Sequence, residues 1–295
     1  MPSKRRMLVG LLGANIQGSI SPALFADAFA AAGIDGYYHL LDADCLPGRR
    51  LPQLFEAIKA AGFAGANVTF PFKQEIIALL DAVDPGAAQV GAVNTVAIAP
   101  DGRTTGYNFD RAGWRNSFNE RIGGASAKDA TVVQIGAGGA GRAVAFALMD
   151  LGVANLVLHD LDAARANALK ADLSSHYGAA RCRVTSDLER DIAAATGVVN
   201  ATQVGMRGFP GNPVPVRALK SSHWAADVIY TPLQTEFLKA AAAKGARVLN
   251  GSGMCVHQAV EAFAQLTGVK PDLARLHRAF ATAVAARDAA FAAAT

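Results

Sequence analysis

A glycine-rich run near the middle of the chain has the residue types and spacing needed to hold a pyrophosphate. Residues 136–141 read G-A-G-G-A-G, directly after the apolar run 131–135 and directly before the helical pattern 142–151. In a G-x-G-x-x-G turn the first glycine permits a tight turn, the second lets the backbone approach the phosphates, and the third allows close helix-strand packing. The helix N-terminus then faces the phosphates. A purely structural glycine turn is the alternative, but the flanking strand and helix favour a cofactor site formed by Gly136, Gly138, Gly139, Ala140 and Gly141.

An acid at the end of the next strand-like segment bears on which dinucleotide binds. Asp160 follows the segment 156–159 and lies 19 residues beyond Gly141. A carboxylate there can accept hydrogen bonds from the ribose 2′-hydroxyl and repels a 2′-phosphate, by about 4 kcal/mol per unit charge at ~4 Å and an effective dielectric near 20. We therefore expect NAD rather than NADP. The alternative is that Asp160 only caps the following helix, while Arg165 or another cation accepts a 2′-phosphate.

Four polar stretches in the first part of the chain stand at the ends of strand-like segments. They are 19–22 (S-I-S-P), 67–73 (N-V-T-F-P-F-K), 91–95 (G-A-V-N-T) and 106–110 (G-Y-N-F-D). Such ends usually meet at one edge of the sheet, where α/β proteins bind ligands. One lysine, one carboxylate, several hydroxyls and several amides suit a small, anionic, polyhydroxylated substrate.

The elements that must position these residues alternate between strand-like and helical patterns. Strand-like runs at 7–13, 37–41 and 66–70 are each followed by a helical pattern, at 22–32, 51–61 and 73–80. This β-α repeat predicts a mostly parallel sheet. Asp84-Pro85 marks the start of another short helix, and Asp101-Gly102 predicts a hairpin turn between 94–99 and 103–107.

A second β-α series begins at Ala130, after a helix at 113–121 and the linker-like stretch 123–129, near which the composition places a domain boundary. Its strands are expected at 131–135, 156–159, 198–201, 225–230 and 247–249, followed by helices at 254–267 and 273–293. The fold class is therefore α/β. The two alanine-rich helices at the end leave open both burial within one subunit and a homodimer.

Composition excludes several classes of protein. Hydrophobic residues make up 52% of the chain but aromatic ones only 7%, which argues against all-β and disordered chains. The excess of 28 − 24 = 4 basic residues suits an anionic small molecule and lacks the clustering of a nucleic-acid surface. Cys45, Cys182 and Cys255 are odd in number and far apart, so neither a disulfide framework nor a metal site is expected, and a cytoplasmic location fits.

The beginning of the chain superficially resembles a signal peptide. Lys4, Arg5 and Arg6 precede the uncharged stretch 7–26. The unbroken apolar run covers only 7–14 and is followed by polar residues, far short of the roughly 20 apolar residues of a membrane span. We expect a buried first strand, and no association with a membrane.

Taken in order, these motifs resemble the shikimate dehydrogenase family, which includes the quinate/shikimate dehydrogenases. The resemblance covers nearly the whole chain and rests on S-x-S-P, N-V-T-x-P-F-K, G-A-V-N-T, G-x-N-x-D, G-A-G-G-A-G, Asn200-Ala201-Thr202, Gly253-Met254 and Gln258-Ala259. It implies a two-domain α/β fold: an α/β substrate-binding catalytic domain at 1–112 and 254–295, and a Rossmann-type NAD-binding domain at 113–253. It also implies reversible oxidation of a ring hydroxyl of shikimate or quinate to the 3-dehydro compound.

The resemblance also implies roles for individual residues. Lys73 and Asp110 become the catalytic pair, in which Lys73 relays the proton of the reacting oxygen and Asp110 orients and balances the ammonium. The implied substrate-binding residues are Ser19 and Ser21, whose hydroxyls bind the carboxylate, and Thr69, Asn94, Tyr230 and Gln258. Thr202 and Gly253 join the candidate cofactor-binding residues. Ser21 can also cap the helix that begins at Pro22.

Departures from the family pattern leave alternatives open. His159-Asp160 replaces the Asn-Arg associated with NADP and points to the NAD-using branch. Gly18 and Ile20 stand where biosynthetic members often carry His and Lys, and Phe109 replaces the usual threonine of N-T-D. The alternatives are an NADP-dependent biosynthetic shikimate dehydrogenase, a dehydrogenase of an unrelated ligand such as a folate, and a non-catalytic NAD sensor, against which the presence of both Lys73 and Asp110 argues. The choice between shikimate and quinate stays open.

Overall fold

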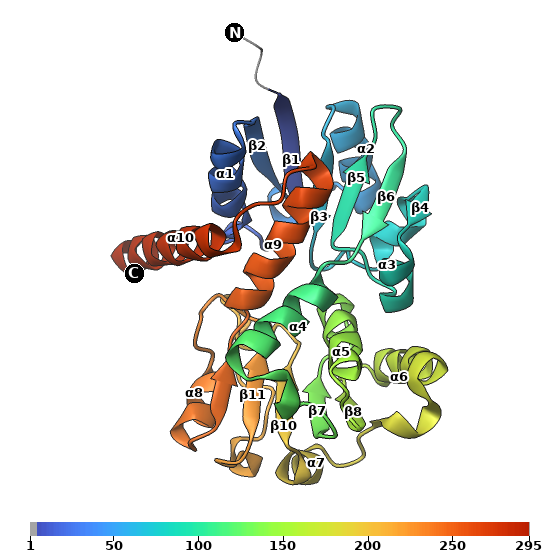
Figure 1. The fold of residues 1–295 in the computed structure, drawn as a ribbon, viewed down its shortest axis with the longest axis vertical. Helices are drawn as coiled ribbons and strands as arrows, with labels where there is room; N and C mark the ends of the chain where they lie inside the picture. The colour runs from blue at the N-terminus through green and yellow to red at the C-terminus, as the bar shows by residue number, and fades with distance from the viewer. Residues whose placement is uncertain (1–4, 295) are drawn as a thin grey trace. The chain divides into compact units, whose positions relative to one another are not determined.

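The computed structural model describes residues 5–294, so that Lys4 of the basic run lies outside the described residues. The chain divides into two compact units, which are described separately below. Unit 1 comprises Met1–Phe109 and Val256–Thr295, and unit 2 comprises Asp110–Cys255. Each unit contains a sheet with helices (Figure 1), and the α/β prediction is confirmed.

Unit 1 is built on a six-stranded sheet with the order β2-β1-β3-β5-β6-β4. The strands are β1 (Arg6–Gly13), β2 (Asp35–Asp42), β3 (Gly65–Val68), β4 (Ala82–Val83), β5 (Thr95–Ile98) and β6 (Thr104–Tyr107). Strands β2, β1 and β3 are parallel, whereas β5 pairs antiparallel with both β3 and β6. The predicted β-α repeat and hairpin are therefore both present, and the first apolar run forms a strand in the middle of the parallel part.

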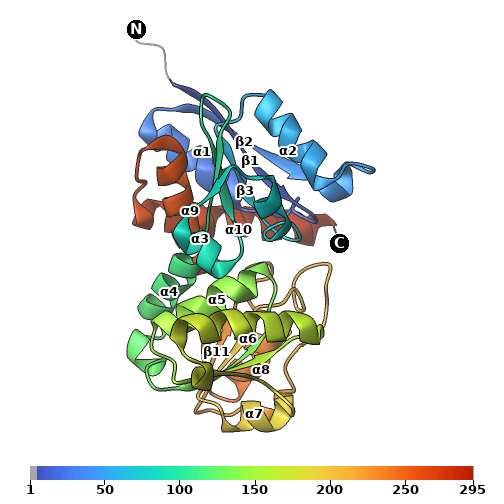
Figure 2. The same cartoon turned by 90° about the vertical axis from the view of Figure 1, so that its right-hand side faces the viewer.

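Helices cover both faces of this sheet. They are α1 (Ser21–Ala32), α2 (Leu51–Ala60), α3 (Pro85–Val90), α9 (Ser252–Thr267) and α10 (Leu273–Ala294), with short 3-10 helices at Ala43–Cys45 and Glu75–Leu79. Figure 2 shows α1 and α9 on one face and α2 on the other. Phe263 of α9 packs on Phe25 and Phe29 of α1, with ring centroids 5.6 and 5.2 Å apart. The C-terminal helices thus complete the core of the N-terminal sheet.

The helix expected at 73–80 is wrong in its type and its start. The carbonyl of Lys73 accepts a hydrogen bond from the N–H of Val93 at 2.7 Å, so it is not part of a helical hydrogen-bond series. A short 3-10 helix follows instead, at Glu75–Leu79. Lys73 therefore stands in a turn tied to the segment that precedes β5.

Unit 2 is a fully parallel six-stranded sheet with the order β12-β11-β10-β7-β8-β9. The strands are β7 (Thr131–Ile135), β8 (Asn155–His159), β9 (Cys182–Val184), β10 (Gly197–Asn200), β11 (Trp224–Asp227) and β12 (Arg247–Leu249). Numbered within the unit, this is the order 3-2-1-4-5-6 of dinucleotide-binding folds, in which ligands bind where the strand order reverses. That point lies between β7 and β10. The sequence did not predict β9, and β11 ends three residues before the predicted Tyr230.

The helices of unit 2 are α4 (Asp110–Arg121), α5 (Gly139–Asp150), α6 (Ala163–Tyr177), α7 (Leu188–Ala194) and α8 (Glu236–Ala243), with 3-10 helices at Gly124–Ser126, Ala179–Arg181 and Val216–Ala218. Ala225 of β11 belongs to the cluster formed with α7 and α8. Its neighbour Trp224 instead meets Phe118 of α4, with ring centroids 4.8 Å apart. Because successive side chains of a strand point to opposite faces, α4 covers the face opposite to α7 and α8.

The linker-like stretch 123–129 does not separate the units. Trp224 donates from Nε1 to the carbonyl of Ser126 at 3.2 Å, and Arg247 donates to the carbonyl of Ile122 at 3.0 Å, so this stretch is attached to β11 and β12 of unit 2. The units divide at Phe109/Asp110 and at Cys255/Val256, three and two residues from the predicted boundaries after residues 112 and 253. Among the described residues, no helix is both long and apolar enough to cross a bilayer.

Candidate active site

The glycine loop of unit 2 joins β7 to α5, and its three motif glycines have different surroundings. Gly136 has a φ of +102°, and a Cβ there would lie 2.7 Å from the carbonyl oxygen of Ala201. A Cβ on Gly141 would lie 2.2 Å from the carbonyl oxygen of Gly136. A Cβ on Gly138, by contrast, would meet no heavy atom within 4 Å. The outer glycines thus serve the turn and the packing, and the middle one borders open space at the helix N-terminus, the position at which dinucleotide-binding folds hold a pyrophosphate.

The side chain of Gln134, on strand β7, stabilises this loop through two hydrogen bonds. Its Nε2 donates to the carbonyl oxygens of Gly136 and Gly141, both at 2.8 Å, and the side chain is fully buried. The sequence reasoning missed this residue. The available signal was a polar side chain within the otherwise apolar interior of the run T-V-V-Q-I.

Asp160 lies beside the glycine loop, at the end of β8. Its Oδ2 accepts a hydrogen bond from the N–H of Ala137 at 2.7 Å, and its Oδ1 accepts one from the N–H of Asp162 at 2.9 Å. The N-cap of α6 is Asp162, not Asp160, and Arg165 forms an ion pair with that cap residue. The alternative interpretation of Asp160 as a helix cap is therefore wrong, and the structure places its carboxylate against the loop expected to hold the phosphates.

In unit 1, Ser19 lies in the turn that leads from β1 into α1, and Ser21 is the first residue of α1. The N–H of Ser19 donates to the carbonyl of Ile16 at 2.9 Å, and the N–H of Ser21 donates to Oγ of Ser19 at 3.2 Å. The N-cap of α1 is Ile20, without a side-chain capping bond, so the expected capping role of Ser21 is wrong. The reason is that the helix begins one residue earlier than Pro22 suggests, which puts Ser21 inside its first turn.

The turn after β3 brings Thr69 next to the turn after β1, and Lys73 follows four residues later in the same segment. The N–H of Thr69 donates to the carbonyl of Leu12 at 2.9 Å, and the N–H of Ala14 donates to that of Phe70 at 2.8 Å. A Cβ on Gly13 would lie 2.4 Å from Cγ2 of Thr69, so only glycine permits this approach. The polar turns that follow these two parallel strands are thus adjacent, as expected from their position at one edge of the sheet.

Asn94 joins the same region from the segment before β5. Its backbone carbonyl accepts from the N–H of Val68 at 2.8 Å, and its Oδ1 accepts from the N–H of Phe109 at 3.0 Å. Asn67 was not among the predicted site residues, yet its buried side chain donates to Oγ1 of Thr95 and accepts from the hydroxyl of Tyr38, both at 2.9 Å. Its position in the motif N-V-T was the available signal. Gln258, the remaining predicted substrate residue of unit 1, lies on α9.

The other predicted residues belong to unit 2. Asp110 is buried in the first turn of α4, directly before Arg111. Arg111 forms a two-pronged pair with Asp150 at the end of α5, with nitrogen-oxygen distances of 2.7 and 2.6 Å. The hydroxyl of Tyr177 donates to the same carboxylate, and burial together with that bond and charge raises the pKa of Tyr177 to about 12. The start of α4, and with it the Asp110 backbone, is thereby held on α5 and α6.

A buried network links the loops that carry Thr202 and Tyr230. Oδ1 of Asn200 accepts from the N–H and the hydroxyl of Thr202, at 3.0 and 2.7 Å. Nδ2 of Asn200 donates to both carboxylate oxygens of Asp227 at 3.2 Å. Asp227 also accepts from the hydroxyl of Thr235 at 2.7 Å, and burial raises its pKa to about 6. The sequence motifs predicted that the loops with Thr202 and Tyr230 belong to the site, but they did not predict the Asn200–Asp227 contact that connects these loops.

Gly253, predicted to bind the cofactor, has a packing reason to be glycine. A Cβ there would lie 2.2 Å from Oγ of Ser117 on α4. The start of α9 therefore approaches α4 closely within unit 2.

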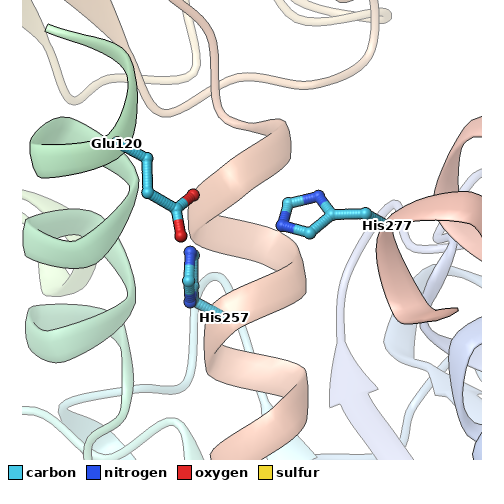
Figure 3. Close-up of side chains that lie close together, drawn as sticks. All are labelled: Glu120, His257 and His277. Carbon is cyan, nitrogen blue, oxygen red and sulfur yellow. The ribbon is translucent and has the colours of Figure 1, made fainter. Parts of the chain in front are cut away.

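Two histidines that sequence spacing did not connect lie side by side on α9 and α10. The rings of His257 and His277 have centroids 5.8 Å apart and are nearly perpendicular. Figure 3 shows the two side chains, one on each helix. They are 20 residues apart in the chain, and only the packing of one helix against the other places them together.

Comparison with known proteins agrees with the two-sheet α/β fold. The family described as the shikimate dehydrogenase substrate binding domain matches residues 11–96. The quinate/shikimate dehydrogenase (NAD(+)) of Corynebacterium efficiens is 44% identical over 278 residues, 93% of this chain and 97% of that protein. The structure of quinate dehydrogenase from Corynebacterium glutamicum in complex with NAD has a TM-score of 0.85 at 41% identity, covering 95% of this chain and 100% of that one. Shikimate 5-dehydrogenase from Thermus thermophilus, in complex with NADP(H) and shikimate, has a TM-score of 0.81 at 35% identity, covering 94% and 99%.

Proposed function

Because this chain belongs to the shikimate dehydrogenase family, we infer that it is an NAD-dependent oxidoreductase that converts a ring hydroxyl of shikimate or quinate to the ketone, reversibly. The observation that carries the inference is the contact of the Asp160 carboxylate with the N–H of Ala137 in the glycine loop, at 2.7 Å. It combines open space beside Gly138 with a carboxylate at the strand end where dinucleotide-binding folds meet the ribose.

The residues of unit 2 fit NAD. A Cβ on Gly138 would meet no heavy atom within 4 Å, so the N-terminus of α5 is open at this residue, and the Asp160 carboxylate can accept a hydrogen bond from a ribose hydroxyl. Thr202 belongs to the next loop of the same sheet edge, after β10, and Gly253 to the start of α9. When bound, NAD supplies the carbon that accepts the hydride. We therefore assign cofactor binding to unit 2 and substrate binding to unit 1.

The residues of unit 1 suit an anionic, polyhydroxylated ring. Ser19 and Ser21 offer hydroxyls to the substrate carboxylate, and Thr69 and Asn94 offer a hydroxyl and an amide to the ring hydroxyls. Gln258 on α9 and Tyr230 of unit 2 complete the proposed substrate contacts. Quinate carries a hydroxyl on the carbon that bears the carboxylate, where shikimate has a ring double bond, so the proposed contacts of Ser19 and Ser21 lie nearest to the difference.

Proton transfer is assigned to Lys73, with Asp110 as its partner. Lys73 hydrogen-bonds the reacting oxygen and takes its proton while hydride leaves the adjacent carbon, so that a ketone forms. Asp110 orients the lysine side chain and balances its charge. Both interactions are stronger in the transition state than with the bound substrate. They therefore lower the activation barrier and do not only tighten substrate binding.

The finer assignments of location and assembly are proposals as well. All three cysteines are free thiols, of which Cys182 and Cys255 are buried, and this supports a reducing cytoplasm.

A homodimer is a prediction that light scattering on the purified protein tests directly.

A spectrophotometric assay of nicotinamide reduction tests the function. Shikimate and quinate are each supplied with NAD and, in parallel, with NADP. We expect turnover of at least one of the two substrates, with a higher kcat/KM for NAD. Equal or higher efficiency with NADP would overturn the cofactor assignment, and no turnover of either substrate would overturn the reaction.

A further inference from the structure

The carboxylate of Asp42, at the end of β2, is saturated with hydrogen bonds from a neighbouring turn. Oδ1 accepts from the N–H of Asn15 at 3.1 Å, and Oδ2 accepts from the N–H of Ile16 at 3.1 Å and from Nε2 of Gln17 at 2.9 Å. The N–H of Asp44 donates the remaining bond to Oδ1, at 3.1 Å. Only 3% of Asp42 is exposed, so these donors replace water around a buried charge.

The turn that Asp42 holds is the one that leads to Ser19 and Ser21. Ile16, whose N–H is bound by Asp42, uses its carbonyl to accept from the N–H of Ser19 at 2.9 Å. Oγ of Ser19 in turn accepts from the N–H of Ser21 at 3.2 Å. An unbroken series of hydrogen bonds therefore runs from Asp42 through Ile16 to both serines.

The backbone of this turn needs such an anchor. Asn15 has a φ of +55°, a conformation that costs free energy in residues other than glycine. On its other side the turn is attached to the segment after β3, through the N–H of Ala14 and the carbonyl of Phe70. Burial works to raise the pKa of Asp42, but the hydrogen bonds from Gln17, Ile16, Asp44 and Asn15 together keep it below its ordinary value. At neutral pH the carboxylate is therefore ionised and acts purely as an acceptor.

We propose that Asp42 is a positioning residue for substrate recognition, which holds the turn 14–20 so that the hydroxyls of Ser19 and Ser21 are aligned for the substrate carboxylate. The proposal rests on the role assigned above to the two serines. It concerns binding, because the hydrogen bonds of the Asp42 carboxylate come from the turn before Ser19 and from Asp44.

Asp42→Asn tests the proposal, because the amide nitrogen cannot accept the bonds that Oδ2 now accepts. We expect the KM for shikimate and quinate to rise about tenfold, with kcat and the KM for NAD changed less than about twofold. The matched control is Asp81→Asn in the same unit, since Asp81 likewise accepts from the N–H and the hydroxyl of Thr104, both at 2.8 Å, beside β4. This control should leave all three parameters unchanged. Gln17→Leu removes a single donor from an exposed side chain and should raise the substrate KM about two- to threefold, so the proposal stays testable if Asp42→Asn does not fold.

A double-mutant cycle with Ser19→Ala separates this inference from the proposed function. If Asp42 acts through Ser19, the double variant should raise the substrate KM by much less than the product of the two single effects. A normal substrate KM in Ser19→Ala alone would refute the assigned role of the serine. A raised KM in Ser19→Ala together with a normal KM in Asp42→Asn and Gln17→Leu, or with fully multiplicative effects, would overturn the role of Asp42.

Discussion

The N–H of Ala137 donates a 2.7 Å hydrogen bond to the carboxylate of Asp160, and so joins the glycine loop after β7 to the end of β8. This contact places a fixed negative charge beside the opening at Gly138. Unit 2 therefore combines the proposed pyrophosphate site with a carboxylate that would disfavour a phosphate on the ribose.

Replacing Asp160 should relax the choice of cofactor. In Asp160→Ser the repulsion of a 2′-phosphate is lost, and we expect the ratio of kcat/KM for NADP to that for NAD to rise about ten- to hundredfold. Asp162→Ser is the matched control, because serine can still cap α6 as Asp162 does. An unchanged ratio in Asp160→Ser, or an equal change in the control, would contradict the assignment.

Removing the amine of Lys73 should affect turnover more than binding. We expect Lys73→Ala to lower kcat by about two orders of magnitude or more, with less than about a fivefold change in the substrate KM. Lys59→Ala serves as the control, since Lys59 lies on α2 of the same unit and pairs with Glu56 at 3.0 Å. Near-normal turnover in Lys73→Ala would reject its role in proton transfer.

The two glycines of the cofactor loop should respond differently to alanine. Gly138→Ala adds a methyl group to open space, so we expect normal folding and a raised KM for NAD. Gly141→Ala drives a methyl group into the carbonyl of Gly136 and should lower the free energy of unfolding by about 1–3 kcal/mol. Thermal unfolding and the KM for NAD, measured on both variants, check the difference. A loss of stability in Gly138→Ala comparable to that in Gly141→Ala would contradict it.

Asp227 should make stability depend on pH above the usual carboxylate range. Burial raises its pKa to about 6 from an ordinary 3.8, so the folded chain binds more protons than the unfolded chain between these values. The free energy of unfolding therefore falls as pH rises from about 4 to 6, by about 3 kcal/mol for this group.

Urea unfolding of the natural chain and of Asp227→Asn across pH 4–7 measures this dependence. The free energy of unfolding of the natural chain minus that of Asp227→Asn should fall as pH rises from about 4 to 6, since the amide does not titrate. Asp81→Asn is the control, because hydrogen bonds from Thr104 lower the pKa of Asp81. The free energy of unfolding of the natural chain minus that of Asp81→Asn should therefore stay nearly constant in this pH range. A flat difference for Asp227→Asn would show that Asp227 does not titrate there.

Much of the fold was predictable because its signals are local. The alternation of strand and helix patterns, the hairpin at Asp101-Gly102 and the glycine loop each depend on residues close together in the chain. The wrong helix at 73–80 shows where this reasoning ends. The apolar pattern of this segment suits a helix. The carbonyl of Lys73 instead accepts a hydrogen bond from the N–H of Val93, which lies in a different part of the chain, the segment before β5.

By itself, then, the sequence determined the α/β class, the order of the elements and the position of the glycine loop, because periodicity and short-range spacing encode all three. The tertiary structure alone decided which distant residues meet. Examples are Asp42 with Ile16, Asn200 with Asp227, and His257 with His277. Each of these contacts joins two elements, and it exists only because a particular strand order or helix packing brings their ends together.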